Sequence, residues 1–408
     1  MAGLFDLRII RQLSIISMVT LALCTGSGCE KNPDNQPVTS PTPYEFPALS
    51  QFPQKLNIPV DNPTTVEGVK LGRYLFYDGR MSGRTGKDSL MSCATCHIQS
   101  KGFECGADHP KFKGGHPFGL PTVNYPEGKP TPHYMMPLVN LVYISSGYLW
   151  NGKIEPGNNN HGPEGYEFMG DDYLNFRSLE SLVWMSIVAE HEFAGSVDRT
   201  VDLIGSIPMY KPMFKAAFGT EEVTIDRISK AVAQFIRTII AYRFKFYKYI
   251  QHEVELTPSE MHGYQLFYSE DGDCFHCHAG SLLMTTTEYY NNAKDTIDDP
   301  TDRYSITGNL IDKGAYRAPS LINCELNGPY MHDGRFKTLD EVIDFYASGL
   351  KYSEYVSSFM TYVQYGGNRL NEQQKADLKA FLLTLTDHDL LTDPAYSCPE
   401  ELGEWGIR

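Results

Sequence analysis

The sequence has no excess of basic residues. Its 408 residues include 35 Lys and Arg against 50 Asp and Glu, which gives a formal net charge of −15. Because proteins bind nucleic acids largely by neutralising phosphates with Lys and Arg, this balance argues against a nucleic-acid partner. An acidic surface suits solubility or the docking of a basic protein, and charge alone does not choose between the two.

Several signatures of common enzyme classes are also missing. The chain has no Gly-rich phosphate loop, no nucleophile elbow and no internal apolar run long enough to cross a membrane. Alternating apolar and polar residues, the pattern of half-buried strands, are scarce. We therefore expect a mostly α-helical globular protein, long enough for two domains with separate cores.

The N-terminus predicts export. Residues 1–29 combine two early arginines, an apolar run at Leu13–Leu23 and small residues directly before Cys29, which is the order of a secretory signal. Small residues before a cysteine resemble a bacterial lipobox, in which Cys29 would be lipidated. Residues 30–50 are rich in Pro, Asn, Ser and Thr and are interpreted as a tether. We expect a protein of the cell envelope, on the periplasmic side and attached to a membrane only by a lipid anchor.

Two groups among the nine cysteines share one motif, "CATCH" at 93–97 and "CFHCH" at 274–278. A C-x-x-C-H string is the attachment signature of c-type haem. Two thiols about one helical turn apart can form thioethers with the two haem vinyl groups, and the next residue directs an imidazole at the iron. The motifs predict two covalent haems, with His97 and His278 as proximal iron ligands and thioethers at Cys93, Cys96, Cys274 and Cys277.

The cysteine pairs have three interpretations other than haem attachment. Two C-x-x-C pairs could bind zinc, one pair could be a redox dithiol, and cysteines of an exported chain could form disulfides. None of these explains a histidine directly after both pairs. His276 lies between the cysteines of its motif and receives no role, and Cys105, Cys324 and Cys398 are expected either to include one disulfide or to be buried thiols.

Helical patterns flank each motif. The stretch 66–83 precedes the first motif, and Thr224 is a plausible N-cap for a helix with apolar residues at helical spacing up to Ile240. In the second half, Thr257, Pro258 and Glu260 form a helix-start signature, and a last helix is predicted to carry Leu378, Phe381, Leu382 and Leu385 on one face. We expect two cytochrome c-like haem domains with long loops, at 51–250 and 251–390, followed by a tail at 391–408.

The chain resembles the bacterial di-haem cytochrome c peroxidase and MauG family. The resemblance spans roughly residues 66 to 386 and rests on stretches that occur in the family's order around the two motifs: "LGRYLFYDGRMSG" with "SCATCH" and "KGF", then "YLWNGK", "GAYRAPSLIN" and "YMHDGRFKTLDEVIDFY".

The resemblance implies a division of labour. The haem on His97 would meet hydrogen peroxide, and the haem on His278 would relay electrons. Cleavage of the oxygen–oxygen bond needs an acid/base group, and the stretch "SLESLVWMSIVAEHEF" places Glu180 on the family's catalytic glutamate. Leu182 replaces the family's glutamine, and residues 154–176 form an insertion.

The sixth ligand of the His278 haem distinguishes the branches of this family. Peroxidases commonly use methionine there, whereas the MauG branch has tyrosine, and Tyr346 occupies the aligned position. A phenolate oxygen lowers the reduction potential, while a thioether raises it. Met331 and Met360 remain alternative ligands.

The resemblance also bears on several other positions. His109 and His116 lie where some members carry a distal histidine, and His332 matches a position near the second haem. Family members hold a calcium ion between the haems, but the asparagine that commonly assists is not evident here. The tryptophan that many members place between the haems is also not evident, since Leu138 and Val139 occupy that region.

The sequence is thus interpreted as an exported di-haem c-type peroxidase. It would reduce hydrogen peroxide with electrons from a small redox protein or another donor. A first alternative is a MauG-like enzyme that oxidises a specific protein or small molecule. A second is a di-haem electron carrier without enzymatic activity. The sequence leaves open the donor, a bound calcium ion and the oligomeric state, a homodimer included.

Overall fold

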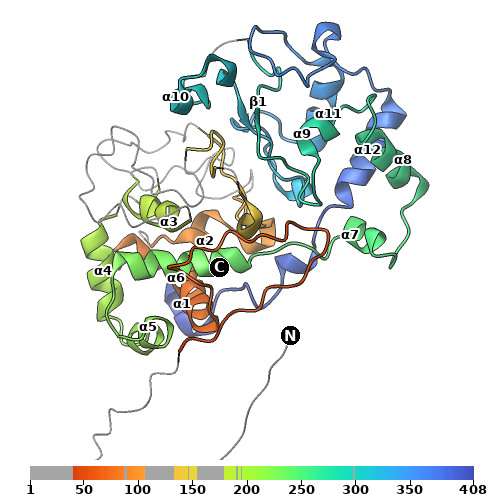
Figure 1. Cartoon of the computed structure of the whole chain (residues 1–408). Coiled ribbons are helices and arrows are strands. Elements are labelled where there is room, and N and C mark those ends of the chain that lie inside the picture. The colour runs from red at the N-terminus through yellow and green to blue at the C-terminus, as the bar shows by residue number, and fades with distance from the viewer. Residues whose placement is uncertain are drawn as a thin grey trace, which may run out of the picture. The chain divides into compact units, whose positions relative to one another are not determined.

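The structure is a computed structural model that describes residues 40–86, 90–105, 133–145, 147–153, 179–189, 192–193, 195–296 and 299–408. The predicted export signal, Cys29, His109, His116 and the insertion lie outside these residues. The described helices are α1 (Val66–Tyr77), α2 (Cys93–Cys96), α3 (Leu179–Val188), α4 (Val197–Ser206), α5 (Tyr210–Phe218), α6 (Ile225–Thr238), α7 (Lys245–Ile250), α8 (Pro258–Phe267), α9 (Phe275–His278), α10 (Tyr304–Thr307), α11 (Leu339–Ser348) and α12 (Glu372–Leu383) (Figure 1).

Strand structure is small in the described part of the chain. β1 (Tyr289–Tyr290) pairs antiparallel with β2 (Tyr316–Arg317), with Tyr289 opposite Arg317. Short 3-10 helices cover Gly79–Ser82, Gln99–Lys101, Leu141–Tyr143, Leu310–Asp312, Cys324–Leu326, Val363–Tyr365, Asp389–Leu391 and Glu400–Trp405. The prediction of a mostly α-helical fold is confirmed.

The first half is organised by helices α1 and α6, which pack against each other (Figure 1). Thr65 caps α1 through a hydrogen bond to the Gly68 N–H, and Thr224 caps α6 by accepting the Arg227 N–H, as its sequence predicted. The helices touch where a Cβ on Gly72 would lie 1.9 Å from the Ala231 carbonyl oxygen. Only glycine permits so close a backbone approach.

The second half repeats this arrangement with α8 and α12 (Figure 1). Thr257 and Glu260 form the predicted capping box at the start of α8, after which Pro258 opens the helix. A Cβ on Gly263 would lie 1.9 Å from the Asp377 carbonyl oxygen. An aromatic pair also joins the two helices at each crossing. Between α1 and α6, the rings of Phe76 and Phe235 have centroids 5.2 Å apart, and between α8 and α12 those of Phe267 and Phe381 have centroids 5.4 Å apart.

The ends of α6 and α12 differ from the sequence prediction in the same way. Ile239, Ile240 and Leu385 are buried but lie beyond the last helical residues Thr238 and Leu383. The carbonyl of Ile239 accepts the backbone N–H of Asn140 (2.8 Å), and the carbonyl of Leu385 accepts that of Asn323 (3.1 Å). These partners come from distant segments, so periodicity along the helix could not reveal where it ends.

Asn140 and Asn323 fix the backbone after α6 and α12 in the same way. Both have a left-handed backbone, with φ of 62°, a conformation that asparagine adopts more readily than most residues. The side-chain oxygen of Asn140 accepts the N–H of Ala241 (3.0 Å), and that of Asn323 accepts the N–H of Asp387 (2.8 Å). Each half therefore has a helix pair whose exit is fixed by an asparagine from elsewhere.

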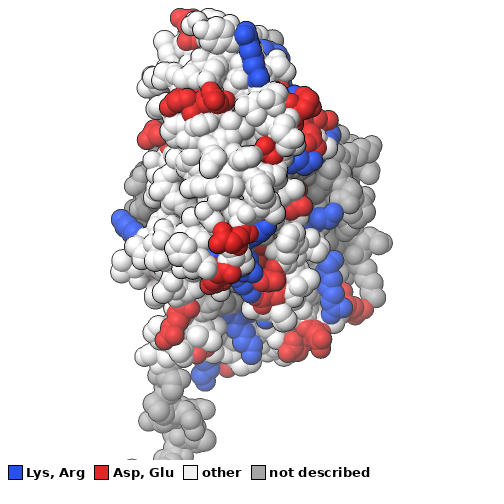
Figure 2. All heavy atoms as spheres, turned by 90° about the vertical axis from the view of Figure 1, so that its right-hand side faces the viewer, with Lys and Arg blue, Asp and Glu red and all other residues white. Residues whose placement is uncertain are grey.

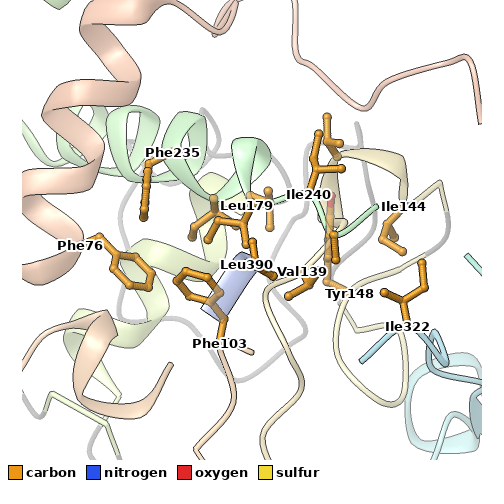
Figure 3. Close-up of a cluster of buried hydrophobic side chains, with 14 of the residues drawn as sticks. Phe76, Phe103, Val139, Ile144, Tyr148, Leu179, Phe235, Ile240, Ile322 and Leu390 are labelled. Carbon is orange, nitrogen blue, oxygen red and sulfur yellow. The ribbon is translucent and has the colours of Figure 1, made fainter. Parts of the chain in front are cut away.

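The core joins both halves. One cluster of buried apolar side chains includes Phe76, Phe103 and Phe235 together with Ile322 and Leu390 (Figure 3). The C-terminal residues also pack on α1, where the Tyr77 hydroxyl donates to the Tyr396 carbonyl (2.6 Å). Residues 40–408 accordingly form one compact unit. The domain boundary at residues 250 and 251 stays a prediction.

The surface carries charges of both signs. On the face shown in Figure 2, acidic and basic side chains are interspersed among uncharged ones. Within the described residues, no helix is long and apolar enough to span a membrane.

The two glycine contacts predict a stability effect. We expect Gly72→Ala and Gly263→Ala each to lower the free energy of unfolding by about 1–3 kcal/mol, because the added methyl group would force the helices apart. Gly205 in α4 is a matched control, since its Cβ would meet only Val223 side-chain atoms at 3.7 Å or more. Gly205→Ala should be neutral or stabilising by up to about 1 kcal/mol. Denaturant unfolding of the haem-loaded protein measures all three, and an effect in the control as large as in the other two would contradict this account.

Candidate functional site

The first C-x-x-C-H motif forms a one-turn helix followed by a fixed histidine. Cys93–Cys96 is α2, and the Thr95 hydroxyl accepts the backbone N–H of Ser92 (3.0 Å) at its start. The Nδ1 atom of His97 lies 3.0 Å from the Phe103 carbonyl oxygen. Because that oxygen can only accept, Nδ1 carries the proton and Nε2 keeps its lone pair. Burial lowers the pKa of His97 to about 4, so the ring is neutral at pH 7, the form that binds metal.

The second motif has the same geometry. Nδ1 of His278 lies 3.1 Å from the Met284 carbonyl oxygen, again six residues later in the chain. Burial lowers the pKa of His278 as well. Phe103 and Met284 both adopt positive φ, 63° and 49°, which is uncommon for residues with a side chain. Two independent loops thus use the same unusual turn to aim a carbonyl at a ring nitrogen, the hydrogen bond that orients histidine ligands of metals.

The contacts of the cysteines argue against the other interpretations. The described cysteines all carry thiols rather than disulfides. Burial raises the pKa of Cys93, Cys274 and Cys277 to about 12, so these thiols are protonated at pH 7 when no ligand is bound. Within the described ranges, the one cluster of three metal-ligating side chains contains no cysteine. Cys105 and Cys324 are buried thiols and Cys398 is half-buried, which matches the second of the two expectations for them.

A cavity opens beside the second motif. Its wall includes Cys274, Cys277 and His278 and is mostly apolar. A haem attached at this motif would therefore lie against this wall.

The cavity wall carries the candidate sixth ligands. Tyr346, Met331 and Met360 all line it. The side-chain nitrogen of Asn292 lies 3.2 Å from the Tyr346 hydroxyl and 3.5 Å from the Met331 sulfur, so it holds the phenol and the thioether close together. Burial raises the pKa of Tyr346. All three predicted alternatives are available, and Tyr346 has a polar neighbour that positions its oxygen.

One buried cation in this wall lacks a carboxylate partner among the described residues. Arg317 is 7% exposed and donates to the Gly147 carbonyl (2.6 Å). Its electrostatic neighbours are Tyr289 and Tyr148, and burial lowers its pKa. A buried guanidinium without a counter-ion is costly, and a haem propionate would supply one. The residues at this motif therefore fit a haem, with Cys274, Cys277 and His278 as attachments and Arg317 as a propionate partner.

Aromatic residues and histidines form one side of the cavity. The His332 ring stacks on Tyr316 with centroids 3.7 Å apart, and its Nε2 lies 3.3 Å from an Asp299 oxygen. Trp150 lines the same cavity with its ring 6.4 Å from that of His332. His332 is thus placed near the second motif, as expected. Trp150 thus gives this cavity wall a tryptophan. It comes from the stretch "YLWNGK" and not from the region of Leu138 and Val139.

Glu180 lies in a buried ion pair. It sits at the start of α3 and is 3% exposed. Its carboxylate oxygens lie 2.8 and 3.0 Å from the guanidinium nitrogens of Arg237, which is fully buried, and one also accepts from the Asn62 side chain (2.6 Å). These bonds fix α3 to α6. The catalytic role of Glu180 stays a prediction.

A second glutamate of the same stretch lies at the first motif. Burial and then the negative charge of Glu192 raise the pKa of Cys93. Glu192 therefore lies within electrostatic reach of the His97 attachment helix. The sequence signal was present, since "SLESLVWMSIVAEHEF" contains Glu192 as its last glutamate, one residue before its end.

His276 also has a partner that sequence reasoning missed. Its Nδ1 lies 2.8 Å from Asp273, and its ring stacks near Phe359. His276 therefore ties the α9 helix to Asp273, which lies just before the helix.

Comparisons with known proteins agree with this site. Residues 66–255 match the family model described as di-haem cytochrome c peroxidase. The methylamine utilization protein MauG of Methylorubrum extorquens is 28% identical over 335 residues, which cover 82% of each chain. The cytochrome c551 peroxidase of Nitrosomonas europaea is 28% identical, over 69% of this chain and 73% of its own.

A solved structure is similar over nearly the whole described chain. It is a MauG-like protein associated with microbial copper homeostasis, with a TM-score of 0.70, 27% identity and coverage of 87% of this chain and 99% of that one. Residues 66–255 therefore form a domain of the di-haem cytochrome c peroxidase family, and the chain is similar over most of its length to relatives named MauG and cytochrome c551 peroxidase.

Proposed function

We propose that this protein reduces hydrogen peroxide to water at the His97 haem, with electrons relayed through the His278 haem. Each turnover consumes one peroxide, two electrons and two protons and yields two waters. When bound, the haems supply an iron centre for peroxide chemistry and a one-electron relay. The observation that carries the proposal is a carboxylate, Glu192, within electrostatic reach of Cys93 in the His97 motif, because peroxide cleavage requires a group that moves a proton.

The protein's own residues divide this work. His97 and His278 would hold the irons, each oriented by a backbone carbonyl. Glu192 would transfer the proton between the peroxide oxygens, while Glu180 and Arg237 would hold α3 in place. A small redox protein or another donor would deliver electrons at the His278 side.

The MauG-like alternative is supported by Tyr346. Its hydroxyl lies in the cavity wall beside His278, where the Asn292 side chain contacts it. We propose Tyr346 as the sixth ligand of that haem, with Met331 and Met360 as the alternatives. In that case the substrate would be a specific protein or small molecule oxidised by the enzyme. Export to the periplasm, lipidation at Cys29, a calcium ion and a homodimer remain part of the proposal.

Substitution of the two glutamates separates their roles. Glu192→Gln should lower kcat for peroxide about 100- to 10,000-fold, because it keeps the size of the side chain and removes the proton-transfer group. Glu180→Gln should instead lower the free energy of unfolding by about 3 kcal/mol or more, since Arg237 would be left buried without its anion. Peroxide consumption with a reduced cytochrome and denaturant unfolding measure the two effects.

The opposite pattern would assign catalysis to Glu180. If the unsubstituted protein consumes no peroxide with any reduced donor, the non-enzymatic electron carrier is the correct reading. Asp377→Asn is a matched control for buried carboxylates away from the His97 motif, because Asp377 lies in α12 and binds Ser259 and Gln373. It should leave kcat unchanged.

Tyr346→Phe tests the sixth ligand. It should change the absorption and paramagnetic resonance spectra of one haem and raise its reduction potential, because an oxygen ligand that stabilises ferric iron is lost. Tyr290→Phe is the matched control: Tyr290 lines the same cavity, but its hydroxyl bonds Thr286. Unchanged spectra in Tyr346→Phe would contradict the assignment of Tyr346 as the sixth ligand. A spectral change in Met331→Leu would then identify the Met331 sulfur as that ligand.

A further inference from the structure

Glu104 is a buried carboxyl group that faces the second haem cavity. It is 1% exposed and lines the same cavity as Cys274, Cys277 and His278. Its Oε2 atom is buried and has no hydrogen-bond partner among the described residues. Because buried polar atoms are nearly always satisfied, an orphaned carboxyl oxygen at a cavity wall indicates a partner that enters with the ligand or with a proton.

The backbone of the same residue belongs to the first haem loop. The Glu104 carbonyl accepts the N–H of Ile98 (3.1 Å), and the preceding carbonyl, of Phe103, orients His97. The main chain of Glu104 is therefore part of the turn that positions one iron ligand, while its side chain reaches the cavity of the other. The loop of His97 thus contributes one carboxyl group to the wall of the His278 cavity, in addition to Asp273 from the second motif's own segment.

The surroundings of Glu104 leave its charge uncompensated. Burial raises the pKa of Glu104 well above its usual value. One electrostatic neighbour in the wall is the half-buried Tyr330, whose pKa Glu104 helps to raise. The other charged or titratable groups of this wall include Tyr134, Asp273, Arg317 and His332. The described ion pairs do not include one with Glu104, and the Arg317 guanidinium is bound to the Gly147 carbonyl.

The charge of a haem in this cavity changes by one unit on reduction. A ferric haem carries one more positive charge than a ferrous haem, and a nearby positive charge favours an ionised carboxylate. Oxidised haem would thus favour the carboxylate of Glu104, and reduced haem would favour the neutral acid in this dry wall.

We propose that Glu104 is a redox-linked proton-binding site, which takes up one proton when the haem on His278 is reduced. One electron passes from the external donor to the iron, and one proton passes from solvent to the Glu104 carboxylate, so that the charge of the cavity is unchanged. On oxidation both leave. The site stores a proton next to the His97 loop at the moment when an electron is available for transfer there. The proposal rests on a haem at His278 and not on peroxide reduction.

The reduction potential of the His278 haem as a function of pH tests this proposal. In the unsubstituted, haem-loaded protein, the reduction equilibrium should change tenfold per pH unit, about 59 mV, over a pH range above the usual pKa of a glutamate. Glu104→Gln keeps the size and a hydrogen-bond donor but cannot titrate, so the slope should become nearly flat. The His97 haem, followed separately by its spectrum, is an internal reference.

Glu325→Gln is the matched control for this change. Glu325 follows Cys324 directly, but it is exposed and accepts a hydrogen bond from Thr386 (2.8 Å). It should keep the slope of the unsubstituted protein. An equal slope in Glu104→Gln and the unsubstituted protein overturns the proposal.

Two further measurements apply if Glu104→Gln does not fold. Glu104→Asp keeps an acid and should retain the slope while moving the pH range in which it occurs. In the unsubstituted protein, reduction in weakly buffered solution should take up close to one proton per electron at the His278 haem, which a pH-indicator dye detects. The absence of proton uptake at every pH overturns the proposal independently of any variant, and neither measurement uses peroxide.

Discussion

The structure depends on a constraint on two half-buried imidazoles, those of His97 and His278. A histidine that binds iron must present a neutral nitrogen with a free lone pair, and its other ring nitrogen must donate its proton to a fixed acceptor. His97 and His278 meet this constraint identically, by donating to a carbonyl six residues later that a left-handed residue turns toward the ring. Such a turn is stable only on a rigid support. The helix pairs α1–α6 and α8–α12, brought into backbone contact at Gly72 and Gly263, provide it.

Buried charges show how the two halves differ. In the first half, Glu180 and Arg237 neutralise each other through several short hydrogen bonds, and the pair needs nothing further. In the second half, Arg317 and Glu104 line a cavity without ionic partners among the described residues. A compensated pair is a means of fixing elements, whereas uncompensated groups at a cavity identify a place that a charged ligand completes. Structural and functional carboxylates are thus distinguished by their partners and not by their residue type.

The sequence predicted local features well and distant contacts poorly. Caps at Thr224 and Thr257 are set by side chains three residues from their partners, so they could be read directly. The helix ends at Ile239 and Leu385 could not, because asparagines from far along the chain take up those carbonyls. The same limitation applies to Glu180: its ion pair with Arg237 spans 57 positions, so the stretch around Glu180 could not reveal that partner.

The sequence by itself determined that two C-x-x-C-H turns exist, that each is flanked by helices, and that the chain resembles one family, because all of these depend on residues close together or on ordered motifs. Tertiary structure alone decided which carboxyl groups face which motif. Trp150, Glu104 and Tyr346 reach the His278 cavity from three separate segments, and Glu192 comes to the His97 helix from a fourth. Side chains from distant segments are brought together only when packing fixes the backbone, so no local pattern could have shown that Glu104 belongs at once to the loop of one haem site and to the wall of the other.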